Sequence, residues 1–176
     1  MSTHADNMAD ALTQRAAQIR LLVLDVDGVL TDGRLYFSAE GEALKVFHVR
    51  DGAGIVQLRK AGIQVAIISG RNAAAVSTRM AELGVLHVQQ GIHDKQAALQ
   101  QLLASLRLSP QNLACVGDDT PDVPMLQMAQ LAVAVADAHP AVRAAAHYVT
   151  QAPGGLGAVR EVCDLILQAQ SGQRDA

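Results

Sequence analysis

Short apolar runs alternate with longer amphipathic stretches along most of this chain. The apolar runs have the length of buried strands, and the stretches between them carry apolar residues at helical spacing. Strands and helices that alternate in this way predict a parallel sheet with helices on its faces. The predicted strands are residues 21–24, 64–68, 85–89, 113–116, 131–135 and 147–149, and the predicted helices are 53–61, 72–83, 95–106, 122–129, a short one after Pro140, and 156–168.

Two regions depart from this alternation. Residues 33–37 and 43–49 have β character and are joined by Ser-Ala-Glu-Gly-Glu, so a protruding hairpin is expected over about residues 31–49. Residues 1–18 are polar and are expected to form a frayed or helical N-terminal extension. Residues 19–176 then form a single α/β domain.

The composition disfavours several classes of partner. Half of the 176 residues are hydrophobic, which is enough for one buried core. A net charge of -3, two Tyr, two Phe and no Trp provide neither a basic surface nor stacking platforms for nucleic acid. No apolar stretch has the length of a membrane span or signal peptide, so we expect no membrane association and a cytoplasmic location. Cys115 and Cys163 are expected to be buried free thiols.

Polar residues with catalytic potential follow the predicted strands. Asp25 and Asp27 follow the first strand, Ser69 follows the next, Lys95 begins a helix, and Asp118 follows the strand that contains Cys115. Because parallel strands bring their carboxyl ends to one edge of a sheet, these residues are expected to converge there. Each signal alone has a plainer explanation, such as a turn, a helix cap or a solvated lysine. Their order along the chain favours one site.

The set contains the parts that phosphoryl transfer requires. Asp25 is the predicted nucleophile, which would form an aspartyl phosphate, and Asp27 is the predicted general acid and base. Ser69, the backbone N–H groups near Gly70, and Lys95 are expected to bind the phosphoryl oxygens.

The acidic residues also predict a metal site. Asp25, Asp118 and a backbone carbonyl near Asp27 offer the all-oxygen ligands that suit Mg²⁺, which is the expected cofactor. Asp119 and Asp122 are expected to hold these ligands in place without contacting the metal themselves.

With this order of motifs, the chain resembles the haloacid dehalogenase superfamily of aspartate-nucleophile phosphatases from about residue 19 to the last helix. The resemblance implies a three-layer α/β/α, Rossmann-like sheet. It is closest to the branch that hydrolyses 3-deoxy-D-manno-octulosonate 8-phosphate for lipopolysaccharide synthesis, which implies Mg²⁺ dependence and a homotetramer whose neighbouring subunits complete each site. The segments that carry this closer resemblance are residues 25–33, the hairpin, 47–55, 69–71, Arg79, 116–119, 133–140 and 154–167.

Two arginines favour an acidic sugar as substrate. Arg71 closely follows Ser69, and Arg79 lies eight residues further along the same predicted helix, so both are expected on one helix face, roughly 12 Å apart. Guanidinium groups bind carboxylates bidentately, which would distinguish a sugar acid from a neutral sugar phosphate. A glutamate occupies the position of Arg71 in the related phosphatase for KDN 9-phosphate, so Arg71 favours the eight-carbon substrate.

The intervals between the motifs leave no room for a separate cap domain, so the site is expected to be open until self-association through the hairpin covers it. His48, Arg50, Asp51 and Gly52 match a segment that contacts substrate in the resembled family, across a subunit boundary. A helix cap by Asp51 is the competing interpretation.

Three segments leave the site's details open. Val56 stands where many relatives carry a basic residue, and Thr120–Pro124 departs from the commoner hydrophobic form of its loop. Pro153-Gly154-Gly155 predicts a flexible loop; in the resembled family the corresponding segment covers a neighbouring active site.

Three other functions compete with this prediction. A signalling receiver module also accepts phosphate on aspartate, but its acidic pair comes first in the chain and its Lys near the end. A binding protein without activity would not need the full catalytic set. A phosphatase for another sugar acid, such as KDN 9-phosphate, or for another small metabolite uses the same machinery.

Overall fold

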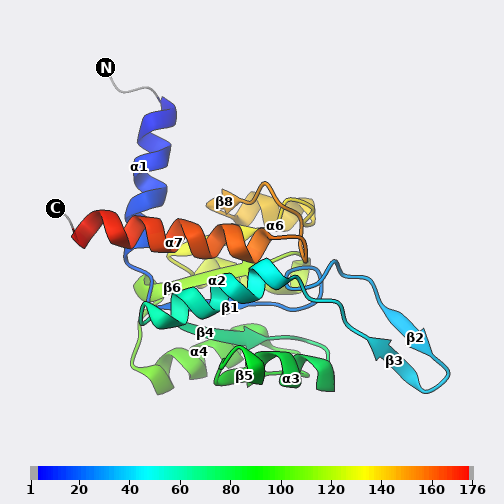
Figure 1. The fold of residues 1–176 in the computed structure, drawn as a ribbon. Coiled ribbons are helices and arrows are strands. Elements are labelled where there is room, and N and C mark those ends of the chain that lie inside the picture. Colours follow the sequence, from blue (N-terminus) through cyan, green and yellow to red (C-terminus); the bar gives the residue numbers. More distant parts are fainter. Residues whose placement is uncertain (1–3, 175–176) are drawn as a thin grey trace.

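The computed structural model describes residues 4–174 and is built around a six-stranded sheet (Figure 1). All of its strand pairs are parallel. The predicted α/β fold is therefore confirmed. In spatial order the strands are β5 (His87–Gln89), β4 (Gln64–Ile68), β1 (Leu21–Leu24), β6 (Leu113–Gly117), β7 (Leu131–Ala134) and β8 (Tyr148–Val149).

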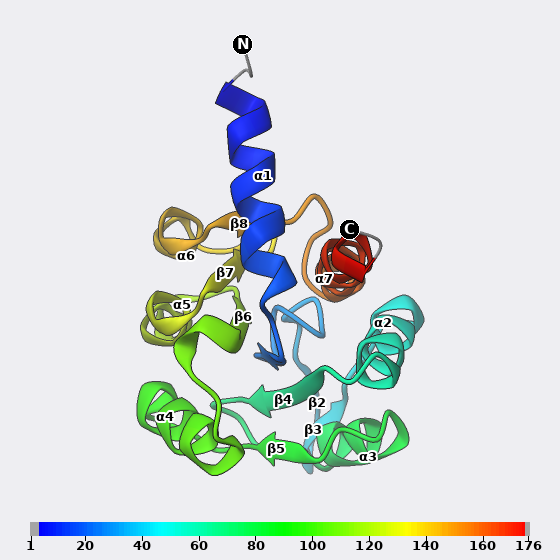
Figure 2. The same ribbon diagram turned by 90° about the vertical axis from the view of Figure 1, so that its left-hand side faces the viewer.

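Helices cover both faces of the sheet and make the predicted three layers (Figure 2). One face carries α2 (Val49–Lys60), α3 (Ala74–Glu82) and α7 (Ala158–Arg174), and the other carries α4 (Lys95–Leu106), α5 (Val123–Met128) and α6 (Pro140–Ala145). Helix α1 (His4–Ala17) extends away from the sheet, and its C-terminal part packs against α7. Two short 3₁₀ turns, η1 (Pro110–Asn112) and η2 (Thr120–Asp122), complete the elements. Within residues 4–174, no helix is both long and apolar enough to cross a bilayer.

Strand β1 determines where the site lies. Its four apolar residues are fully buried, as expected for a strand covered by helices on both faces. The chain continues to β4 and β5 on one side of β1 and later returns to β6, β7 and β8 on the other side. Ligands in open α/β sheets bind beside the carboxyl end of the strand where the order reverses in this way.

The predicted hairpin projects from the carboxyl edge of the sheet as β2 (Tyr36–Ser38) and β3 (Gly41–Leu44) (Figure 1). Gly41 takes the turn at φ +117°, a conformation that favours glycine. The second hairpin segment is shorter than predicted, since residues 45–48 are not strand and Val49 already begins α2. His48 causes this early start, because its Nδ1 accepts a hydrogen bond from Arg50 N and caps the helix.

Other helix limits also differ from the pattern. Helix α3 begins at Ala74 rather than residue 72, and α7 begins at Ala158 and runs on to Arg174. The predicted helix at 122–129 is preceded by η2, whose Pro121 fits the first positions of a helical turn. The N-terminal stretch is helical, and its Arg15 Nη1 donates to Gln130 O at 2.8 Å.

Candidate active site

A pocket of about 360 Å³ opens at the carboxyl end of β1, where β4 and β6 flank that strand. The structure brings to it all nine residues predicted for phosphoryl transfer, for metal binding and, from Arg71, for substrate recognition. They line the pocket together with Gly33 and Pro121: Asp25, Asp27, Ser69, Gly70, Arg71, Lys95, Asp118, Asp119 and Asp122. Residues that are up to 97 positions apart in the sequence (Asp25 to Asp122) thus share one site.

Lys95 is the buried cation of this pocket. Its Nζ lies 3.0 Å from Asp25 Oδ1 and 2.7 Å from Asp122 Oδ1. Burial opposes the charge of the ammonium group, but the negative charges of Asp25 and Asp122 raise the pKa of Lys95 above its usual value. Lys95 therefore stays protonated beside Asp25, where it can offset the charge of an incoming phosphate.

Asp122 holds the loop after β6 in place. Its Oδ1 accepts from Lys95, while its Oδ2 accepts from the backbone N–H groups of Asp118 and Asp119 at 3.0 and 3.4 Å. Gly117 lets this carboxylate approach the strand, because a Cβ there would lie 2.5 Å from Asp122 Cβ. With both oxygens engaged, Asp122 supports the site by holding Lys95 and the loop that carries Asp118.

The turn after β4 positions Ser69. Ser69 is almost fully buried, and its N–H donates to Gln89 O while its carbonyl accepts from Ile92 N. Gly91 N donates to Arg71 O at 3.1 Å, so the whole turn is bound to the segment that follows β5. These backbone hydrogen bonds hold the Ser69 side chain at the pocket wall without using its hydroxyl.

The site fits a divalent cation. Asp25, Asp118 and Asp122 each have an oxygen within 4.8 Å of the others. Asp118 Oδ1 is buried without a hydrogen bond, and Asp25 Oδ1 has Lys95 Nζ beside it at 3.0 Å. Burial, and after it the nearby negative charge of Asp122, raises the pKa of Asp118 to about 8 and that of Asp25 to about 6. Such a cluster needs positive charge, and oxygen-rich sites of this kind suit Mg²⁺.

These raised pKa values predict how the metal-free protein responds to pH. A carboxyl group whose pKa is higher in the folded state favours folding when it is protonated, and this contribution is lost as the pH rises through about 6 and then about 8. The unfolding temperature without Mg²⁺ should therefore fall between about pH 4 and about pH 8, and Mg²⁺ should restore it most at the higher pH.

Thermal unfolding with Mg²⁺ and with a chelator measures this effect. Asp118→Asn is the control, because it removes the group with the larger shift and should flatten both the pH dependence and the response to Mg²⁺. An unfolding temperature that rises with pH in the metal-free protein would contradict the raised pKa values.

Two residues of the hairpin segment, Lys45 and Glu42, contact pocket residues and were not predicted. Lys45 Nζ donates a hydrogen bond to Asp27 Oδ1 and lies 2.8 Å from Glu42 Oε1, and its side chain is only 2% exposed. Burial opposes the ammonium charge, but hydrogen bonds with Asp27 and Glu42 raise the pKa of Lys45. The only sequence signal is the Glu42–Lys45 spacing, which is common on solvated surfaces.

Arg71 and Arg79 do not share a helix face, which corrects the prediction. Arg71 precedes α3; its Nη2 donates to Glu42 Oε2 at 3.1 Å and its Nε lies 3.7 Å from Asp27 Oδ2. Arg79 lies on α3, pairs with Glu82 and packs over Gly52, outside the pocket of Asp25. The turn after β4 delays the helix until Ala74, so the two side chains diverge.

The segment of residues 48–52 also lies outside this pocket in the same chain. Asp51 does not cap its own helix: its Oδ1 accepts from Arg160 N at 2.8 Å and so caps the start of α7. Gly52 leaves space for Arg79, and His48 caps α2. Contacts of this segment with substrate across a subunit boundary remain a prediction.

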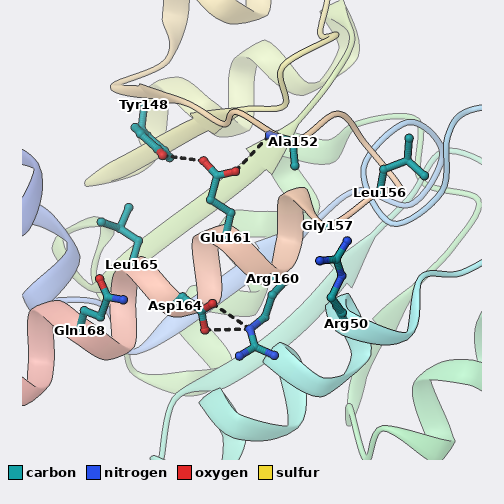
Figure 3. A pocket seen from close by; sticks show the side chains of 10 residues that line it. All are labelled: Arg50, Tyr148, Ala152, Leu156, Gly157, Arg160, Glu161, Asp164, Leu165 and Gln168. Atoms are coloured by element: carbon teal, nitrogen blue, oxygen red, sulfur yellow. Dashed lines mark hydrogen bonds and ion pairs between the residues drawn. The ribbon is translucent and has the colours of Figure 1, made fainter.

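Arg50 faces a second hollow, a groove of about 420 Å³ between α7 and the loop that follows β8 (Figure 3). Tyr148 donates to Glu161 Oε1 at 2.6 Å, and Glu161 also accepts from the backbone of Gln151 and Ala152. Arg160 pairs with Asp164 through both carboxylate oxygens. The bonds of Glu161 anchor the loop to α7, whereas the Arg160–Asp164 pair lies within α7.

Comparison with known proteins agrees with the geometry of the Asp25 pocket. Residues 85–159 match the model of the haloacid dehalogenase-like hydrolases. The chain is 53% identical to a 3-deoxy-D-manno-octulosonate 8-phosphate phosphatase of Yersinia pestis over 93% of this chain and 87% of the relative. The chain belongs to the haloacid dehalogenase-like hydrolases. The enzyme of that name from Escherichia coli K12 is also 53% identical, over 89% of this chain and 83% of its own length.

Solved structures of the same family share the whole architecture. The crystal structure of the Yersinia pestis phosphatase has a TM-score of 0.91 at 52% identity and covers 94% of this chain and 89% of its own. The Moraxella catarrhalis phosphatase, solved with magnesium, phosphate and KDO, has a TM-score of 0.90 at 41% identity and covers 94% and 95%. A relative with the same architecture has thus been solved with magnesium bound.

Proposed function

We propose that this chain is a Mg²⁺-dependent phosphatase that hydrolyses 3-deoxy-D-manno-octulosonate 8-phosphate to 3-deoxy-D-manno-octulosonate and phosphate. The convergence of Asp25, Asp27, Ser69, Lys95 and Asp118 on one pocket carries the proposal. The identity to phosphatases named for this substrate supports the choice of sugar acid. The product would serve lipopolysaccharide synthesis, as the family resemblance implies.

In the first step, an Asp25 carboxylate oxygen attacks phosphorus, and the bond between phosphorus and the sugar oxygen breaks. Asp27 gives its proton to the departing sugar oxygen and becomes a carboxylate. Lys95 offsets the negative charge between Asp25 and the phosphoryl oxygens. The Ser69 hydroxyl and the backbone N–H of Gly70, which line the same pocket, donate to those oxygens.

In the second step, water attacks the aspartyl phosphate. Asp27 takes a proton from that water, the bond between Asp25 and phosphorus breaks, and phosphate leaves. Asp27 is protonated again and Asp25 is again a carboxylate, so the cycle closes. This second role of Asp27 distinguishes the site from a phosphate-accepting module that does not turn over.

The metal would be held by Asp25, Asp118 and the backbone carbonyl of Asp27. Mg²⁺ supplies positive charge that reduces the repulsion between the carboxylates and the phosphate dianion. Asp122 and Asp119 keep the loop that carries Asp118 in shape through hydrogen bonds to Asp118 N and Thr120 N.

Arg71 is the proposed determinant of the sugar acid, because it is the guanidinium group that lines the pocket. Initial rates on a panel of sugar phosphates should be highest with 3-deoxy-D-manno-octulosonate 8-phosphate and lower with KDN 9-phosphate and neutral sugar phosphates. Arg71→Ala should lower kcat/KM for the sugar acid by roughly 10- to 100-fold, the value of a charge-assisted hydrogen bond, with a smaller effect on neutral sugars.

Arg79→Ala is the comparison variant, since Arg79 lies outside the pocket of its own chain. An unchanged preference for the acid in Arg71→Ala would refute the role of Arg71. A selective loss in Arg79→Ala alone would instead place the recognition of the carboxylate across a subunit boundary.

We further propose that the protein works as a homotetramer. The hairpin exposes Phe37, Leu44 and Val46, each more than half exposed, and the pocket beside it has no cap domain. Association that buries these side chains would also cover the pocket. Light scattering at assay concentration should give four chains, and a fully active single chain would contradict this.

The catalytic unit is proposed to be residues 19–176, with residues 1–18 as an extension whose helix packs on α7. The reaction is proposed to occur in the cytoplasm, because a multiply charged sugar phosphate does not cross a bilayer unaided and must be hydrolysed where it is made. Cell fractionation with activity measurements tests this location.

A further inference from the structure

Lys45 is a buried cation within an exposed segment. Its side chain is 2% exposed, whereas the residues on either side of it, Leu44 and Val46, are about half exposed. Burying an ammonium group is costly unless it is paired, and Lys45 has two acidic partners, Asp27 and Glu42. The Lys45 side chain is therefore held toward Asp27, the carboxylate that transfers protons in the proposed reaction.

Glu42 links the same network to the pocket wall. Its Oε1 lies 2.8 Å from Lys45 Nζ, and its Oε2 accepts from Arg71 Nη2 at 3.1 Å. Arg71 reaches Asp27 only at 3.7 Å, so the close cationic partner of Asp27 is Lys45. Lys45 itself is not among the residues that line the pocket of Asp25.

We propose that Lys45, held by Glu42, is a positioning residue for Asp27 in phosphoryl transfer, so that the hairpin segment controls proton delivery to the leaving group. The proposal rests on the proposed function. When Asp27 gives its proton to the leaving oxygen, the carboxylate that forms lies beside the Lys45 ammonium and is stabilised by it. Lys45 gives up no proton and breaks no bond.

This role makes the effect of Lys45 depend on the leaving group. A sugar alkoxide is a strong base and needs the proton from Asp27, whereas p-nitrophenolate leaves without one. A lysine that only stabilised the hairpin would affect both substrates equally. The difference between the two leaving groups therefore separates positioning from folding.

Single-turnover rates of Lys45→Met on the two substrates test the proposal. With 3-deoxy-D-manno-octulosonate 8-phosphate, phosphoryl transfer should slow by roughly 100-fold, the lower end of general acid catalysis. The burst of p-nitrophenolate from p-nitrophenyl phosphate should stay within about threefold of wild type. Lys60→Met, which removes an exposed lysine on α2, should change neither rate.

Glu42→Gln serves as a second variant if Lys45→Met does not fold, because it keeps Lys45 and removes its anchor. It should show the same selectivity with a smaller loss. Equal losses on both substrates, or no loss in either folded variant, would overturn the role of Lys45. If the wild-type protein releases no phosphate from either substrate, the proposed function fails instead.

Discussion

Asp25→Asn is expected to abolish turnover, with kcat lowered by at least about 10⁴-fold. The amide is close in size to the carboxylate and can occupy the same place beside Lys95, but it cannot form the aspartyl phosphate. Asn also removes one negative charge from the cluster with Asp118 and Asp122, so the folded protein should be as stable as wild type or more stable without metal. Phosphate release in the presence of Mg²⁺ and thermal unfolding measure the two effects.

Asp164→Asn is the matched control for the loss of one carboxylate. Asp164 lies on α7, in the groove of Figure 3, and pairs with Arg160 there. This variant should keep wild-type turnover. Full activity in Asp25→Asn would refute the assignment of the nucleophile.

Gly154→Ala is expected to give the largest loss of stability. A Cβ at Gly154 would lie 1.7 Å from Gly28 O and 2.6 Å from Gly28 C, and Gly28 belongs to the turn that carries Asp25 and Asp27. Backbone atoms cannot yield as a side chain can, so one of the two loops must move. We expect the free energy of unfolding to fall by about 3 kcal/mol or more, which is at or above the upper end of the usual range for overpacked sites.

The same change should impair catalysis in the protein that still folds. Gly155 N donates to Val29 O, which binds this loop to the turn that carries Asp25, and Gly154 N donates to Asp137 Oδ1, which binds it to the segment after β7. A displacement of about 1 Å at the nucleophile costs roughly 100-fold in rate.

Gly172→Ala is the control for this glycine, because it lies on α7 with nothing within 4 Å of the added Cβ. It should be neutral or stabilising by about 0.5–1 kcal/mol, since alanine favours a helix. Urea unfolding and the rate of phosphate release compare the two variants. Equal stability of Gly154→Ala and wild type would show that the two loops do not pack as described.

The parallel sheet and the pocket could be predicted because both follow from local patterns. Apolar runs such as Leu21–Leu24 identify buried strands, and the geometry of a parallel sheet brings the residues that follow them to one edge. Asp25, Ser69 and Asp118 could therefore be assigned to one pocket without knowing any distance.

The contacts of the hairpin segment could not be predicted, because they depend on how it folds back over the sheet. The sequence alone indicates a solvated surface lysine at Lys45, whereas the structure shows it buried against Asp27. The separation of Arg71 from Arg79 depends on where the turn after β4 ends, and helix limits are poorly defined by periodicity.

The role of Gly154 was hidden for a different reason. Pro-Gly-Gly indicates flexibility by composition, yet Gly154 and Gly155 are buried here, where the absence of a side chain lets two backbones meet. Composition alone does not distinguish a mobile glycine from one that a close approach requires.

Trapping the aspartyl phosphate tests the nucleophilic role of Asp25 most directly. Asp27→Asn, which lacks the base for the second step, is mixed with Mg²⁺ and p-nitrophenyl phosphate, quenched in acid and analysed by peptide mass spectrometry. We expect one phosphoryl group on the peptide that contains Asp25, and none when Asp25 is also replaced by Asn. Release of p-nitrophenolate with no phosphoryl group on that peptide, or with the group on another residue, would contradict this role.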